Sequence, residues 1–219
     1  MALDAGDYPL ALSLLLKALQ QNEANKDSIL LKNETLDESN TLNQLGNVYL
    51  HLRQPDNAVD AFEKGVKISP GNMALRTNLG GLYRSLGKRD RARVTMEQGL
   101  ALCDWGEDTV TYATLANKTA IDLQPDGTQI AAKHILKGTS SPIKPPAALL
   151  NNLGLIELED GNYQVALFLF ERAAELCGAD QGEMRSEDGD SALSTMKRNV
   201  EKAREALLQS AISLTSANR

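Results

Sequence analysis

The chain has 219 residues, an ordinary hydrophobic share of 42%, few aromatic residues at 4%, and a formal net charge of -6. This acidic balance argues against nucleic-acid binding, which needs a basic surface. No run approaches the roughly 18 consecutive apolar residues that span a bilayer. We therefore expect neither a nucleic acid nor a membrane as the partner.

The N-terminal region is rich in leucine between residues 9 and 19 and could be mistaken for a signal peptide. Asp4 and Asp7, however, stand where a signal peptide carries positive charge, and Lys17 interrupts the apolar run. We predict an amphipathic helix instead, and a reducing, cytoplasmic location. Cys103 and Cys177 are then expected to be small buried side chains without a disulfide.

A pattern of small and large residues recurs along the chain, and Gly80 follows Gly46 after 34 residues. Its first copy reads Leu42-x2-Leu45-Gly46-x2-Tyr49, Ala58-x3-Phe62 and Pro70. Its second copy reads Leu79-Gly80-x2-Tyr83, Ala92-x3-Met96 and Gly99. A third copy reads Leu150-x2-Leu153-Gly154, Ala166-x3-Phe170 and Ala173.

This pattern resembles the tetratricopeptide repeat family, with leucine in place of the usual tryptophan at the first position. The resemblance implies an all-α superhelix of helical hairpins, an α-solenoid, whose first helices line a concave face where peptides or proteins dock. We expect six segments. They are an orphan half-repeat with its connection at 1–38, repeats at 39–72 and 73–106, a degenerate hairpin with a proline-rich linker at 107–146, a repeat at 147–180, and an acidic loop with a capping helix at 181–219.

The two ends of the array are predicted to be irregular. Gly6, Tyr8 and Ala11 match the start of a second helix, so the chain opens in the middle of a repeat. Either the chain is a piece of a longer array, which the apolar face of this helix favours, or the orphan helix is an N-terminal cap. Thr35-x2-Glu38 predicts a capping box for the next helix. Residues 191–214 predict a C-terminal capping helix with one apolar stripe and a charged back.

Candidate binding residues are first-helix positions that the repeat pattern does not need for packing, and many of them are amides. Gln44, Asn78 and Asn152 each stand immediately before a Leu-Gly pair. An amide offers a donor and an acceptor, so it can pair a peptide bond whatever the side chain. The arrangement resembles the asparagine ladder of the O-GlcNAc transferase repeats, and the alternative is a solvated polar face. The candidates are Asn43, Gln44, Asn47, Thr77, Asn78, Arg84, Asn151 and Asn152.

Other binding modes of the family fit less well. Asn47 and Asn78 match two asparagines of the two-carboxylate clamp, but Asn43, Asp108 and Tyr112 stand where basic residues are needed. A cluster of basic residues between positions 84 and 93 is interpreted as a solvent-exposed turn; the alternative is a binding site for an acidic segment of a partner.

The sequence carries no catalytic constellation, phosphate loop, dinucleotide fingerprint or zinc motif, so we expect no cofactor, no metal and no enzyme activity. The leading hypothesis is a non-catalytic adaptor that binds a peptide or protein in its concave groove. The alternative is the substrate-recruiting arm of a larger glycosyltransferase or methyltransferase, and a third is a subunit held permanently in an assembly.

Overall fold

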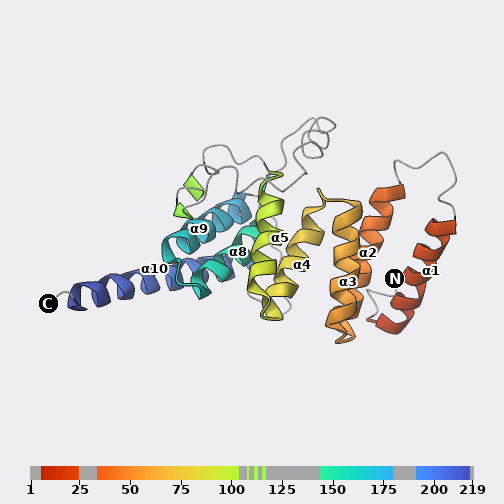
Figure 1. Cartoon of the computed structure of the whole chain (residues 1–219), viewed down its shortest axis with the longest axis horizontal. Coiled ribbons are helices and arrows are strands. Elements are labelled where there is room, and N and C mark those ends of the chain that lie inside the picture. Colours follow the sequence, from red (N-terminus) through yellow and green to blue (C-terminus); the bar gives the residue numbers. More distant parts are fainter. Residues whose placement is uncertain are drawn as a thin grey trace. The chain divides into compact units, whose positions relative to one another are not determined.

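A computed structural model describes residues 6–24, 34–103, 108, 111–112, 115–116, 144–179 and 191–217. These residues form α-helices and no strand, which confirms the all-α prediction (Figure 1). The chain divides into two compact units, Met1–Lys88 and Arg89–Arg219. Unit 1 holds α1 (Tyr8–Ala24), α2 (Glu34–His51), α3 (Pro55–Ile68) and α4 (Met73–Ser85). Unit 2 holds α5 (Arg89–Leu100), α8 (Ala147–Glu159), α9 (Tyr163–Ala179) and α10 (Ala192–Ala217).

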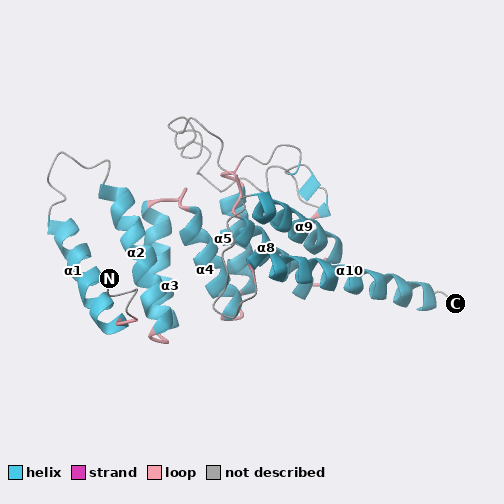
Figure 2. Ribbon diagram, turned by 180° about the vertical axis from the view of Figure 1, so that it is seen from behind, coloured by secondary structure: helices cyan, strands magenta, loops and turns pink. Residues whose placement is uncertain are grey.

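Unit 1 is built on the hairpin of α2 and α3, with α1 packed on α2 and α4 packed on α3 (Figure 2). The helices approach closely at Gly46, where a Cβ atom would lie 2.3 Å from the ring of Phe62. Phe62 is fully buried, and Leu42 and Leu45 join it in the core. The small and large residues of the repeat pattern therefore pack against each other as predicted.

Local sequence signals set most of the helix ends in unit 1. Pro55 occupies the first turn of α3, where the missing N–H of proline costs no hydrogen bond. The side chain of Asn72 caps α4 by accepting a hydrogen bond from the backbone N–H of Leu75 at 3.2 Å. The capping box predicted at Thr35 is wrong, because α2 begins at Glu34 and Thr35 lies inside the helix.

The turn before each second helix carries a residue with positive φ. These residues are Gly6 (70°) before α1, Arg53 (58°) before α3, Gly87 (72°) before α5 and Gly161 (81°) before α9. Glycine adopts this conformation without a steric penalty. The match places α1 in the position of a second helix, in agreement with the sequence pattern.

Unit 2 contains the hairpin of α8 and α9, with α10 packed on α9 and α5 packed on α8. Gly154 repeats the close approach of Gly46, since a Cβ there would lie 2.7 Å from the Phe170 ring. The degenerate hairpin predicted at 107–146 lies outside the described residues, apart from residues 108, 111–112, 115–116 and 144–146.

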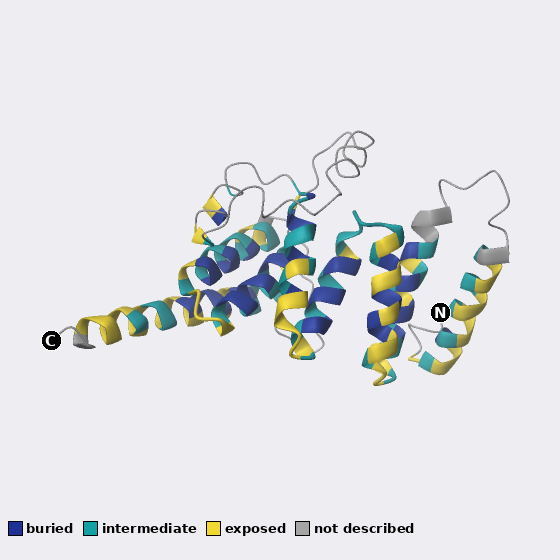
Figure 3. Ribbon diagram, viewed as in Figure 1, coloured by how far each residue is buried: buried dark blue, intermediate teal, exposed yellow. Residues whose placement is uncertain are grey.

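Helix α10 confirms the predicted capping helix. Met196, Val200 and Ala203 are buried, and Val200 and Ala203 pack with Ala166 and Phe170 of α9. Figure 3 shows the buried face of this helix giving way to exposed residues toward its C-terminal end. The charged back exposes Glu201 to solvent. The helix therefore covers the last hairpin with one face and presents polar residues with the other.

Candidate functional site

The predicted binding residues of unit 1 lie on its two first helices. Asn43, Gln44 and Asn47 belong to α2, and Thr77, Asn78 and Arg84 belong to α4. Gln44 is exposed, and the other five are half-buried. Because the residues that flank them, such as Leu45 and Leu79, fill the core, these polar side chains lie at the margin between core and solvent.

Two of these residues bind each other. The Nδ2 group of Asn78 donates a hydrogen bond to Oδ1 of Asn43 at 2.9 Å, joining the first helices of successive repeats. Asn72 adds longer contacts, since its Nδ2 lies 3.4 Å from Oγ of Ser39 and 3.4 Å from Oδ1 of Asn40. The polar face of unit 1 is therefore an ordered network that cross-links α2 to α4.

Unit 2 repeats this amide pair. The Nδ2 group of Asn199 on α10 donates to Oδ1 of Asn151 on α8 at 2.9 Å. Asn151 stands three residues before Gly154, as Asn43 stands three residues before Gly46. Asn199 is only 5% exposed, and sequence reasoning missed it. Asn199 immediately precedes the core residue Val200, as Asn78 precedes Leu79, but the Leu-Gly pair that marks Asn78 is missing there.

The other predicted residues differ in the side-chain hydrogen bonds that they make. Thr77 donates its hydroxyl hydrogen to the carbonyl of Met73 within its own helix at 2.7 Å. Gln44, Asn47 and Asn152 make no side-chain hydrogen bond within the part of the chain that the structure describes. Asn47 and Asn152 are half-buried, so a ligand could reach them without any rearrangement of the helices.

A separate charged cluster joins α5 to α8 in unit 2. The guanidinium of Arg93 forms ion pairs with Glu157 and Asp160, and Arg89 pairs with Asp160 at 3.1 Å. Glu157 also accepts a hydrogen bond from Nδ2 of Asn162 at 2.8 Å. Burial alone would lower the pKa of Arg93, but the neighbouring Glu157 and Asp160 outweigh it and raise that pKa.

This cluster explains two features of the sequence. Glu157 stands where the earlier repeats have Tyr49 and Tyr83, and it is fully buried because Arg93 and Asn162 satisfy its oxygens. Arg89 and Arg93 belong to the predicted basic cluster, and both form ion pairs within unit 2, but the Arg89 side chain is 50% exposed and that of Arg93 is 19% exposed. Arg93 therefore joins α5 to α8, whereas Arg89 remains accessible to solvent.

Tyr112 lies beside the same cluster. Its side chain is fully buried, and its hydroxyl donates to Oε1 of Glu97 on α5 at 2.9 Å. Burial first, and then the nearby carboxylates Glu97 and Glu157, strongly raise the pKa of the Tyr112 hydroxyl. The tyrosine is therefore held in its neutral form as a hydrogen-bond donor.

A comparison with known protein families matches residues 39–72 to the tetratricopeptide repeat family. This range is the hairpin of α2 and α3 in which Gly46 packs on Phe62. The chain therefore contains a tetratricopeptide repeat at these residues. Tetratricopeptide repeats generally mediate protein–protein interactions, and the fold is typically non-catalytic.

Several solved structures have a fold similar to that of the chain. BtubC from P. vanneervenii is 20% identical, with a TM-score of 0.55 over 99% of this chain and 77% of that one. The first repeat domain of human RPAP3 is 17% identical, with a TM-score of 0.47 over 80% of this chain and 97% of that one. MamA is 16% identical, with a TM-score of 0.46 over 96% of this chain and 94% of that one. No curated protein matches the sequence.

The described helices and the two cysteines also bear on the predictions about membranes and disulfides. Among the helices that the structure describes, none combines the length and the apolar character that crossing a bilayer requires. Cys103 and Cys177 are both free thiols and both half-buried.

Proposed function

We propose that this tetratricopeptide repeat protein is an adaptor that binds an extended segment of a partner protein along the amides of its first helices. The observation that carries the proposal is the recurrence of one amide pair, Asn43 with Asn78 and Asn151 with Asn199, at the same place in both units. A solvated polar face does not need ordered amide pairs that recur at one slot.

Each pair holds its amides in one orientation. In the Asn43–Asn78 pair, one N–H and one carbonyl oxygen are engaged, which leaves donors on Asn43 and an acceptor on Asn78. A peptide backbone offers one donor and one acceptor at each residue, so it complements these groups whatever its side chains. Because the pair fixes the side chains before binding, little conformational entropy remains to be lost.

Amides that make no side-chain hydrogen bond within the described part of the chain extend this surface. Asn47 lies one helical turn beyond Asn43 on α2, where the two side chains share a face. Asparagine is a poor helix former and costs several tenths of a kcal/mol against alanine. A role in binding accounts for its presence at positions where the helix alone would favour another residue.

Phage display of random 12-residue peptides on the full chain tests the proposal. Fluorescence polarisation should then show that the double variant Asn47→Ala/Asn78→Ala binds a selected peptide about tenfold more weakly, because each lost hydrogen bond contributes about 0.5–1.5 kcal/mol. Asn57→Ala is the matched control, since Asn57 is an exposed amide on α3, away from the first helices, whose side chain donates a hydrogen bond to Gln54.

A second experiment, on a peptide from the same selection, tests whether the protein contacts the backbone of the peptide. Methylation of single peptide nitrogens should abolish binding at two or more positions, whereas most single alanine replacements in the peptide should be tolerated. Equal affinity of the double variant and the Asn57→Ala control would remove the proposal, and so would a selection that enriches no peptide.

A further inference from the structure

Helix α10 is longer than the hairpin that it covers. It runs for 26 residues, and its C-terminal part extends past α8 and α9 (Figure 1). Its N-terminal part packs on unit 2 through the buried residues Met196, Val200 and Ala203. Residues 206–215, which we call the α10 tip, continue the helix for about 15 Å beyond this contact.

The α10 tip exposes apolar side chains to solvent. Leu208, Ile212 and Leu214 are 64%, 66% and 64% exposed, more than any other large apolar side chain among the described residues. Leu207 is half-buried. A single exposed leucine is ordinary, but a contiguous exposed apolar patch marks an interaction site. The α10 tip therefore needs a partner that covers it.

The apolar side chains of the α10 tip share one face of the helix. With 3.6 residues per turn, Ala211 lies at the centre of this face, and Leu207 and Leu214 lie on one side of it. Leu208 and Ile212 lie on the other side of Ala211. Large side chains thus flank a small one, which is a shape that lets a second helix approach closely.

This face continues an interface that is already formed within unit 2. Val200, Leu207 and Leu214 follow one another at intervals of seven residues, so they lie nearly in line along α10. At one end of this line, Val200 packs with Ala166 and Phe170 of α9. The same apolar stripe is therefore covered by α9 over the first part of the helix and uncovered over the tip.

The absence of charge from the α10 tip indicates what kind of partner covers it. Residues 197–205 include six charged side chains, whereas residues 206–215 include none. Charges across an interface select a partner and repel a like-charged one. Two identical tips can meet face to face without such repulsion. The tip also lacks the Lys, Arg and aromatic residues that are typical of helices lying on a membrane surface.

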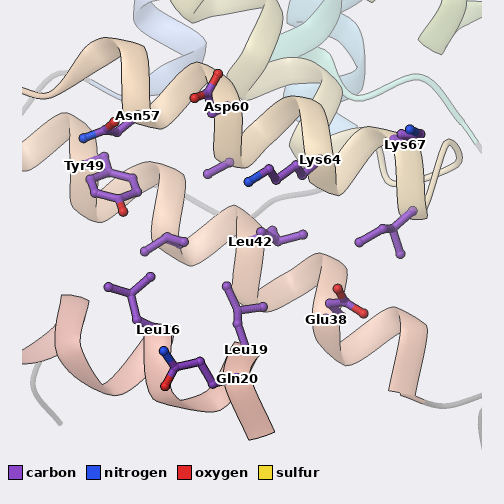
Figure 4. A pocket seen from close by; sticks show the side chains of 13 residues that line it. Leu16, Leu19, Gln20, Glu38, Leu42, Tyr49, Asn57, Asp60, Lys64 and Lys67 are labelled. Carbon is purple, nitrogen blue, oxygen red and sulfur yellow. The ribbon is translucent and has the colours of Figure 1, made fainter. Parts of the chain in front are cut away.

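A cavity in unit 1 is a second apolar surface, but it fits the α10 tip less well. It has a volume of about 530 Å³ and is lined by leucines of α1 and α2 (Figure 4). Charged residues of both signs also line it, namely Glu38, Asp60, Lys64 and Lys67. An uncharged tip would remove water from these groups without offering them an ionic or polar partner. Another tip carries no such cost.

We propose that the chain forms a two-fold dimer in which two α10 tips pack antiparallel. The two-fold axis passes near Ala211, so Ala211 lies opposite its own counterpart. Leu207 of one copy then faces Leu214 of the second copy, and Leu208 faces Ile212. Each contact is made twice, as in any isologous interface. This interface goes beyond the proposed function and does not rest on it.

Sedimentation equilibrium of the full chain, at micromolar to millimolar concentration, is the first test. We expect a reversible equilibrium between monomer and dimer. The variant Leu208→Ala/Ile212→Ala should raise the dissociation constant at least about a hundredfold, because it truncates four apolar side chains in each dimer. Thermal unfolding of the dilute variant should match that of the dilute parent chain, since both residues are exposed. Leu10→Ala/Leu14→Ala is the matched control on α1, where these leucines are 48% and 53% exposed.

Disulfide cross-linking tests the two-fold axis. The two natural thiols, Cys103 and Cys177, are first replaced by alanine. In that background, Ala211→Cys should give a covalent dimer on mild oxidation, because the two Cα atoms would lie within the roughly 7 Å that a disulfide requires. Ser213→Cys is the control, since residue 213 lies on the opposite side of the helix and should not cross-link.

Four results would overturn the proposal. One is a chain that stays monomeric at millimolar concentration, and another is equal cross-linking through positions 211 and 213. Species larger than a dimer that disappear in Leu10→Ala/Leu14→Ala would show that the tip binds α1 of the next copy. A monomer that co-sediments with phosphatidylcholine vesicles, and loses this binding in Leu208→Ala/Ile212→Ala, would identify a lipid surface as the partner of the tip.

Discussion

Replacing Gly46 by alanine tests the close packing of α2 on α3. The new Cβ would lie 2.3 Å from Cε1 of Phe62 and 2.6 Å from two further ring atoms. Because Phe62 is fully buried, its ring can move away only by displacing the residues packed around it. Overpacking of a core costs about 1–3 kcal/mol, while the change from glycine to alanine inside a helix gains about 1 kcal/mol.

With contacts this short, we expect the clash to lie at the upper end of that range. The net loss is then about 1–2 kcal/mol, which corresponds to a fall in melting temperature of about 4–16 °C for a unit of this size. Circular dichroism at 222 nm during heating measures it. The double variant Gly46→Ala/Phe62→Leu should recover part of the loss, because the smaller side chain leaves room for the methyl group.

Gly178→Ala is the control for helix propensity alone. Gly178 lies in α9, and a Cβ there would meet nothing within 4 Å. Its replacement should stabilise the chain by up to about 1 kcal/mol. If Gly46→Ala proved as stable as Gly178→Ala, the close approach of the two helices in the first repeat would be refuted.

Three further predictions concern polar contacts. A double-mutant cycle of Asn43→Ala and Asn78→Ala in urea unfolding should give a coupling energy of about 0.5–1.5 kcal/mol, and additivity would argue against their hydrogen bond. Arg93→Met should cost about 3 kcal/mol because it strips the buried Glu157 of its cation, and Glu157→Tyr in that background should restore much of the loss. The pKa of the Tyr112 hydroxyl is raised in the folded chain, so Tyr112 stabilises the fold below about pH 10 and less so above it. Above about pH 10 the hydroxyl loses its proton in the unfolded chain but keeps it in the folded chain. The free energies of unfolding of the chain and of its Tyr112→Phe variant are compared at pH 8 and at pH 10.5. Between these two pH values, the difference should change by several tenths of a kcal/mol or more in favour of the phenylalanine variant.

Much of the fold follows from the repeat spacing because that spacing encodes contacts within one hairpin. Gly46 and Phe62 belong to adjoining helices, so their meeting needs only a short turn and a close approach. The same logic identified α1 as a second helix from Gly6 and Tyr8, and α10 as a cap from its single apolar stripe.

Contacts between hairpins could not be read in this way. Arg93 lies in the stretch interpreted as an exposed basic turn, and Glu157 was not a candidate residue. Only the packing of α5 on α8 brings the two together. Asn199 was overlooked because no Leu-Gly pair follows it in α10, whereas such a pair follows Asn78. In each case the partner stands dozens of residues away in the sequence. The length of the intervening segment decides which residues meet, and the local pattern carries no information on that length.

The position of α2 has a consequence for affinity. The helix lies between the amide face, with Asn43 and Asn47, and a cavity of about 530 Å³ that Leu42 and Leu45 line together with leucines of α1. A partner that carries an extended segment and, beyond a linker, an apolar segment would engage both surfaces of one unit. The second contact would then form at the millimolar effective concentration that a short flexible tether provides. Two individually weak ligands would in that way combine into one strong and selective interaction, and loss of either would release the other.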